Sequence, residues 1–160
     1  MPIIKLKTII KSDLKVVFDL SRSIDLHKIS TKHTNETAID GKTSGLIELN
    51  EYVTWRAKHL GIYQTLTTVI TEMNSPYSFT DEMTKGAFKR FKHQHLFRQE
   101  KDSVEMIDIF DYSSPFGFLG RIIDLLFLKN YMTNLLIKRN ETIKEFAENG
   151  NYTKVLKEKN

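Results

Sequence analysis

The alternation of apolar and polar side chains divides the first two thirds of the chain into predicted elements. Residues 3–10 alternate as in a half-buried β-strand. Residues 13–22 and 24–30 carry apolar side chains three and four positions apart, which predicts two short helices. Alternation then returns and predicts five strands, at 51–60, 62–72, 77–83, 88–99 and 104–112.

The last third of the chain follows a helical period instead. Apolar side chains recur every three or four residues from 119 to 148 and predict one amphipathic helix about 45 Å long. The short connections between the strands indicate sequential antiparallel neighbours. A sheet with one apolar face and a helix with one apolar stripe can bury each other. We therefore expect an α+β fold in which a curved antiparallel sheet packs against the long C-terminal helix.

Composition limits the class of protein. The 160 residues fit a single domain, which we place at 1–150, followed by a flexible basic tail at 151–160. Apolar residues make up 40% of the chain and charged residues 28%, so wholesale disorder is excluded. The absence of cysteine excludes disulfides, thiolate nucleophiles and cysteine-ligated metals, and it favours a reducing compartment.

The apolar stretches are too short or too charged for targeting or membrane insertion. Lys5, Lys7 and Lys11 interrupt the first eleven residues, unlike the core of a signal peptide. The longest apolar run, 116–128, contains Arg121 and Asp124 and is too short to span a bilayer. We expect a cytoplasmic protein without an integral membrane segment.

The net charge of +4 comes from one segment. Residues 85–101 carry +5, so the rest of the chain sums to −1. In the strand predicted there, Arg90, Lys92 and Arg98 share one face, and Glu105 and Asp111 on the next strand are possible partners. Nucleic-acid binding needs more cations on one surface, often with stacking aromatics, so we expect a solvated face and no nucleic-acid partner.

The opposite faces of these strands carry five titratable residues among aromatic and aliphatic ones. These residues are His59, Asp81, His93, His95 and Asp108. Burying them is costly unless they are paired or hydrated. Three interpretations remain: the histidines and aspartates form core hydrogen bonds or a wet rim, the cluster lines a ligand cavity, or His93 and His95 bind a metal ion together with His59 or Asp108.

We favour the ligand cavity, without a metal or other cofactor. Trp55 fits the core as well as a ligand wall, and the core is the simpler of its two assignments. The residues expected to contact a ligand are Trp55, His59, Phe79, Asp81, Phe91, His93, His95, Phe97, Asp108, Phe110, Tyr112 and Met132.

Several short motifs in this order resemble a known superfamily. They are 53–59 (VTWRAKH), 79–83 (FTDEM) with Gly86 and Phe88, 91–97 (FKHQHLF), Asp108, Tyr112, Pro115 and Arg139-Asn140. Over about residues 2–148 the chain resembles the START/SRPBCC helix-grip superfamily, which includes polyketide-cyclase-like proteins. The closest resemblance is to bacterial ligand-binding members of the cell-division-inhibitor-like subgroup. It implies about seven strands, two short helices between the first two, and a cavity for a lipid, polyketide or similar molecule between sheet and helix.

The resemblance does not decide between a binding protein and an enzyme. We expect a carrier or sensor of an apolar small molecule. The alternative is a cyclase, dehydratase or hydrolase in which His59, His93 or His95 acts as general acid or base and Asp81 or Asp108 orients it. The ligand and the oligomeric state stay open.

Overall fold

A computed structural model of the chain describes residues 2–114 and 127–156. Its elements, in chain order, are β1 (Ile3–Ile10), α1 (Leu14–Ser21), α2 (Ile24–Ser30), the 3₁₀ turn η1 (Lys32–Thr34), β2 (Thr37–Gly41), β3 (Tyr52–His59), β4 (Ile62–Asn74), β5 (Ser78–Lys85), β6 (Arg90–Glu100), β7 (Ser103–Ser113), α4 (Lys129–Glu148) and α5 (Tyr152–Val155).

The strands form one antiparallel sheet in the order β1-β7-β6-β5-β4-β3-β2. Each of the six strands predicted from alternation is present, with ends within two residues of the expected ones. The seven-stranded sheet of the helix-grip fold is therefore confirmed. The pattern does not predict β2, because this five-residue edge strand is mostly exposed and has no alternating apolar face.

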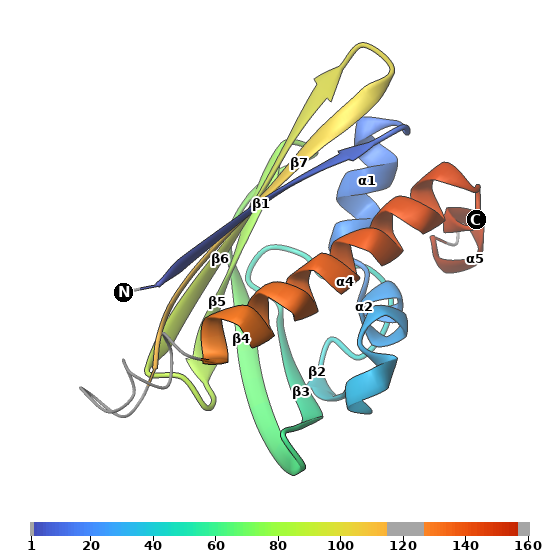
Figure 1. The fold of residues 1–160 in the computed structure, drawn as a ribbon. Helices are drawn as coiled ribbons and strands as arrows, with labels where there is room; N and C mark the ends of the chain where they lie inside the picture. The colour runs from blue at the N-terminus through green and yellow to red at the C-terminus, as the bar shows by residue number, and fades with distance from the viewer. Residues whose placement is uncertain (1, 115–126, 157–160) are drawn as a thin grey trace.

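The helices lie on one side of the sheet (Figure 1). The chain leaves β1 at one edge, passes through α1 and α2, and enters β2 at the opposite edge. α4 crosses the sheet and contacts β1, α1 and α2. The predicted long helix is confirmed over α4, while its first residues, 119–126, lie outside the described part of the chain.

The start of the expected tail is folded. α5 follows α4 closely, and Tyr152, Val155 and Leu156 pack against the core. The sequence did not predict this contact, because only three apolar residues are spread over a lysine-rich segment. Within residues 2–114 and 127–156, no helix has the combination of length and apolar character that a membrane crossing requires.

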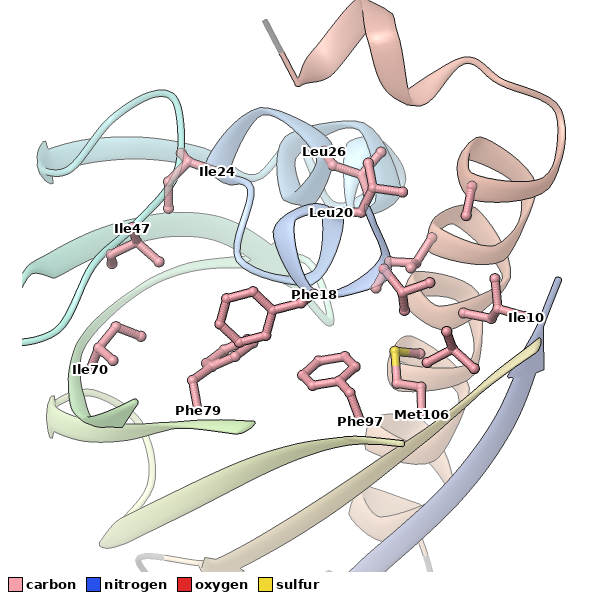
Figure 2. Close-up of a cluster of buried hydrophobic side chains, with 14 of the residues drawn as sticks. Ile10, Phe18, Leu20, Ile24, Leu26, Ile47, Ile70, Phe79, Phe97 and Met106 are labelled. Carbon is pink, nitrogen blue, oxygen red and sulfur yellow. The ribbon is translucent and has the colours of Figure 1, made fainter. Parts of the chain in front are cut away.

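The main hydrophobic cluster fills the space between α1, α2, the last turns of α4 and the sheet (Figure 2). Phe18 of α1 is fully buried at its centre. Its ring meets Phe79 of β5 at 5.7 Å and Phe97 of β6 at 5.6 Å between centroids, both edge-on. Such edge-to-face pairs are favourable beyond the area they bury, so Phe18 fixes α1 on the sheet.

We predict that Phe18→Ala lowers the free energy of unfolding by about 3–5 kcal/mol, because the large buried ring leaves a cavity that its neighbours cannot fill. Urea unfolding followed by circular dichroism measures the change. Ile29→Ala is the control: Ile29 lies on α2 but is 46% exposed, and its loss should change stability by no more than about 0.5 kcal/mol. Equal effects of the two variants would contradict the central role of Phe18.

Candidate functional site

A cavity of ≈ 250 Å³ lies among residues of α2, η1, β3–β7 and α4. Its wall is mainly apolar and includes nine of the twelve residues expected to contact a ligand: Trp55, His59, Phe79, Asp81, Phe91, His93, His95, Phe110 and Met132. The other three, Phe97, Asp108 and Tyr112, are buried but do not belong to the lining. Trp55 combines both of its possible roles, since it joins the core cluster and the cavity wall.

Strand register brings together four of the five titratable residues expected on the inner face. Asp81 of β5 lies opposite His93 of β6, and His95 of β6 lies opposite Asp108 of β7. The hydrogen bonds run diagonally: His93 Nε2 is 3.0 Å from Asp108 Oδ1, and His95 Nε2 is 3.0 Å from Asp81 Oδ1. Both histidines thus contact a carboxylate on a neighbouring strand.

His95 lies between two carboxylates. Its Nδ1 is 2.9 Å from Asp108 Oδ1, but the geometry there is not that of a hydrogen bond, and Nδ1 has no hydrogen-bond partner. The ring of His95 also stacks on Phe79 at 4.1 Å and meets His93 at 3.9 Å between centroids. These contacts hold the imidazole in one orientation.

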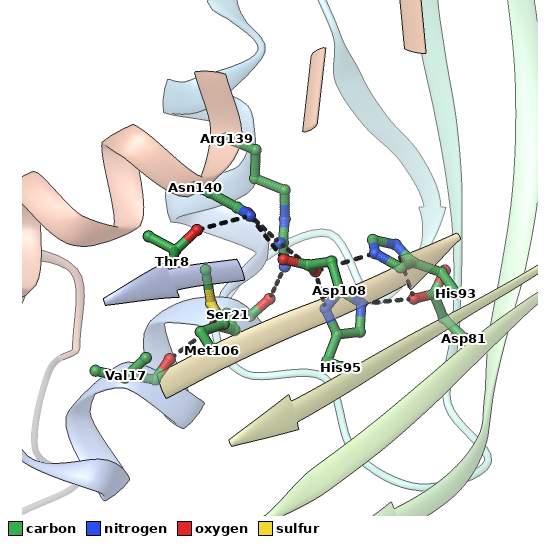
Figure 3. Close-up of polar contacts among 10 residues, drawn as sticks. All are labelled: Thr8, Val17, Ser21, Asp81, His93, His95, Met106, Asp108, Arg139 and Asn140. Carbon is green, nitrogen blue, oxygen red and sulfur yellow. Dashed lines mark hydrogen bonds and ion pairs between the residues drawn. The ribbon is translucent and has the colours of Figure 1, made fainter. Parts of the chain in front are cut away.

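Two residues of α4 complete the environment of Asp108 (Figure 3). Asn140 Nδ2 donates to Asp108 Oδ2 at 2.7 Å, and Arg139 Nη1 lies 3.5 Å from Asp108 Oδ1. Arg139 also donates to the backbone oxygen of Ser21 in α1 at 2.9 Å. Both α4 residues are buried, so the helix presents a charge and an amide to the sheet within its apolar stripe.

The local charges and hydrogen bonds shift several pKa values. Burial acts to raise the pKa of Asp108, but polar contacts with His93 and His95 and the charge of Arg139 outweigh it and hold that pKa well below its usual value. The pKa of Asp81 is lowered as well, since its bond to His95 and the charges of both histidines exceed the effect of burial. Burial, followed by the charge of His95, lowers the pKa of His93.

A second polar group lines another part of the cavity wall. His59 Nδ1 is 2.9 Å from the hydroxyl of Tyr131, and His27 Nε2 is 3.1 Å from Glu36 Oε2. Burial lowers the pKa of His59. Among the described residues, His59 is therefore separate from the Asp81–His93–His95 group in which the sequence hypothesis placed it.

The geometry allows two kinds of chemistry. Asp81 and His95 are hydrogen-bonded and both reach the cavity wall, which suits them to move a proton to or from a bound molecule. In addition, Asp81, His93 and His95 each offer one metal-ligating atom, and these atoms lie within 4.8 Å of one another. This set differs from the metal site considered from sequence, in which His59 or Asp108 is the third ligand, because the fold places Asp81 beside the two histidines.

The basic residues on the outer face of β6 are ion-paired. The expected partners Asp111 and Glu105 are among the contacts, which are Arg90–Asp111 at 2.7 Å, Arg98–Glu105 at 3.5 Å, Arg98–Glu100 at 2.7 Å, Lys92–Glu72 at 3.4 Å and Lys92–Glu82 at 3.6 Å. Much of the local positive charge is therefore balanced by neighbouring carboxylates.

Alternation alone did not identify Arg139, Asn140, His27, Glu36 and Tyr131 as members of these polar groups. A signal existed for Arg139, because a charged residue occurs three positions after the buried Leu136 and four before the buried Ile143. Glu36 gives no such signal. It precedes the exposed strand β2 and becomes part of the cavity wall only through the fold.

Comparison with solved structures shows the same fold in proteins of distant sequence. A protein from Thermus thermophilus superposes with a TM-score of 0.69 at 16% identity, covering 89% of this chain and 97% of that one. Ginseng major latex-like protein 151 from Panax ginseng gives 0.68 at 16% identity, covering 91% and 97%. A START superfamily protein from Mycobacterium smegmatis gives 0.68 at 10% identity, covering 89% and 97%.

These similarities establish that the chain has the helix-grip fold of START superfamily proteins, as the sequence resemblance predicted. No protein-family model and no curated protein sequence matches the chain.

We predict that Asp108→Asn lowers the free energy of unfolding by about 3 kcal/mol, since it leaves Arg139 buried without its carboxylate partner. Chemical unfolding of the purified variant measures the loss. The double variant Asp108→Asn/Arg139→Met should lose less free energy of unfolding than the two single variants together, because both changes remove the same interaction.

Asp111→Asn is the matched control for this experiment. Asp111 belongs to the same strand, but its side chain is 30% exposed and pairs with Arg90 on the outer face. Loss of such a surface pair costs about 1 kcal/mol or less. If both Asp→Asn variants lose the same free energy of unfolding, the buried contacts of Asp108 contribute no more to stability than a surface ion pair does.

Proposed function

We propose that the protein binds an apolar small molecule in the cavity between the sheet and α4, as a carrier or sensor. The observation that carries this proposal is the cavity itself, ≈ 250 Å³ beside a filled hydrophobic cluster. Protein interiors are normally packed to the density of organic crystals. A space that aromatic side chains surround and leave open is the usual form of a site for an organic ligand.

The distribution of polar groups indicates the form of the ligand. Asp81, His93 and His95 lie in one part of the wall, while His59 and Tyr131 lie in another. Most of the surface inside the cavity is nevertheless apolar. This arrangement suits a mainly apolar molecule with one or two polar groups, because its carbon skeleton would contact the rings and its polar atoms the imidazoles.

Trp55 provides a direct measurement of binding. It is the chain's single tryptophan and belongs to the cavity wall. We predict that 1-anilinonaphthalene-8-sulfonate quenches Trp55 emission saturably, and that native mass spectrometry of freshly purified protein finds a co-purified molecule. Thr68→Phe, which places a ring into the cavity from β4, should weaken binding of the probe by at least about tenfold, the equivalent of 1.4 kcal/mol.

Thr65→Phe is the matched control, since Thr65 is exposed on the same strand and outside the lining. It should leave the probe affinity within about twofold. Thermal unfolding of both variants establishes that they are folded. If Thr68→Phe is folded and binds the probe as well as wild type does, binding occurs outside the cavity and the proposal fails.

The hydrogen-bonded pair of Asp81 and His95 favours a second candidate function. An imidazole beside a carboxylate at a cavity wall can act as general acid or base on a bound ligand, with Asp81 orienting the ring. Such an enzyme would be a cyclase, dehydratase or hydrolase acting on the same kind of molecule.

A comparison of co-purified molecules separates the two functions. An enzyme would convert its substrate in the wild type, whereas His95→Asn would retain unconverted substrate. We therefore predict different co-purified molecules if chemistry occurs, distinguished by mass in native mass spectrometry or, where cyclisation conserves mass, by chromatography of the released molecule. A pure binding protein would hold the same molecule in both. Identical mass and identical chromatographic retention, with comparable occupancy, would count against the enzyme.

A further inference from the structure

We propose that Asp81, His93 and His95 form a binding site for a divalent transition metal ion at the cavity wall. Their ligand atoms come from two adjacent strands and lie within 4.8 Å of one another. Two of the separations are shorter: Asp81 Oδ1 is 3.0 Å from His95 Nε2 and 3.8 Å from His93 Nδ1. The site goes beyond binding of an apolar molecule, and it can exist whether or not such a molecule is bound.

The backbone holds the three residues in the required arrangement. His93 and His95 are two positions apart on β6, so both side chains point to the inner face of the sheet. Asp81 faces His93 directly across the β5–β6 pair. Because all three belong to paired strands of one sheet, the donor set exists without a loop having to close.

Asp108 determines which nitrogen atoms are free to bind a cation. An ionised carboxylate only accepts hydrogen bonds, so the bond between His93 Nε2 and Asp108 Oδ1 requires the proton on Nε2. In neutral His93 the other nitrogen, Nδ1, then carries a lone pair, and it is directed toward Asp81. Metal-binding histidines usually donate their second nitrogen to a carboxylate in this way.

His95 lies between the same two carboxylates, but its contacts differ from those of His93. Its two ring nitrogens lie 3.0 Å from Asp81 and 2.9 Å from Asp108, while a neutral imidazole has only one N–H to donate. In the neutral form that a metal ion requires, one contact sets a nitrogen lone pair against a carboxylate. A metal ion between Asp81 and Nε2 would remove this conflict, because it attracts both ligands there and leaves the proton on Nδ1, the nitrogen that faces Asp108. Figure 3 shows His95 between the two carboxylates.

The charges around the site favour a cation. A histidine binds a metal ion only as the neutral imidazole. In that state Asp81 and Asp108 are negative and Arg139 is positive, so the group sums to −1. Arg139 and Asn140 bind Asp108 from α4, whereas Asp81 has no contact with them among the bonds described. Asp81 therefore remains the carboxylate available to a metal ion, and Asp108 the one that orients the histidines.

The donor set also specifies the kind of ion. Two imidazole nitrogens and one carboxylate oxygen suit Zn²⁺ or Fe²⁺, whereas Mg²⁺ and Ca²⁺ prefer oxygen ligands. At ligand distances of about 2.1 Å, two donors are at most about 4.2 Å apart. Separations of up to 4.8 Å thus require only small side-chain rotations. The three residues line the cavity, so a remaining coordination position would face its interior.

The test uses the full chain, freed of metal with a chelator, and titration with Zn²⁺ or Co²⁺. We expect one ion per chain by calorimetry and a Co²⁺ visible spectrum of mixed nitrogen and oxygen ligation. Asp81→Asn and His95→Gln should each weaken binding by more than about 100-fold, since even residues that merely orient a ligand contribute 10–100-fold. The control is His33→Gln, which changes an exposed histidine outside the cavity. Its metal affinity should stay within about twofold of the wild-type value.

Nuclear magnetic resonance of the wild type provides a measurement that needs no variant. Zn²⁺ should shift the imidazole nitrogen signals of His93 and His95, and those of His33 should not move. The absence of saturable binding would overturn the proposal, as would Zn²⁺ shifts confined to other histidines. The metal titration contains no apolar probe, so absence of metal binding would not count against ligand binding in the cavity. Conversely, the result of the probe experiment with Thr68→Phe does not test the metal site.

Discussion

The Asp108 carboxylate is fully buried on β7, and the polar part of the structure is arranged around it. It contacts both histidines of β6 and two residues of α4. An unpaired charge in this environment would cost several kcal/mol. α4 must therefore lie where Arg139 and Asn140 can reach Asp108. Through the bond from Arg139 to Ser21, the same contact also fixes α1, so one carboxylate aligns helix and sheet.

This polar group separates two apolar regions of different character. On one side, Ile143 and Ala147 of α4 join the densely filled cluster around Phe18. On the other, Leu136 joins the smaller cluster of Phe91, Phe110 and Tyr112. Residues of both clusters line the cavity, among them Trp55 of the first and Phe91 of the second. The first region supplies burial for stability. The space that both clusters line can remain open, because the position of α4 is already determined by its C-terminal half and by Asp108.

Much of this arrangement could be predicted from sequence. The alternation of apolar and polar side chains in six strands, and their helical period in α4, indicate which face of each element is buried. The same alternation placed Asp81, His93, His95 and Asp108 on one face of the sheet. It could not pair them, since register depends on where each hairpin turns, and a shift of one residue would exchange the faces. Nor could it bring α4 to Asp108, which is a contact between segments 31 residues apart.

The polar group around Asp108 lies between the packed core and the cavity, and this position allows it to take part in chemistry. Hydrogen bonds and charges act more strongly where water is excluded, and the packed region excludes it on one side of Asp108. Asp81 and His95 extend from that side to the cavity wall, so groups oriented in a rigid, apolar environment reach an open space. Proton transfer and metal binding both need this combination of fixed geometry and access. The fold therefore supports apolar binding along most of the cavity and directed chemistry where Asp81 and His95 reach its wall.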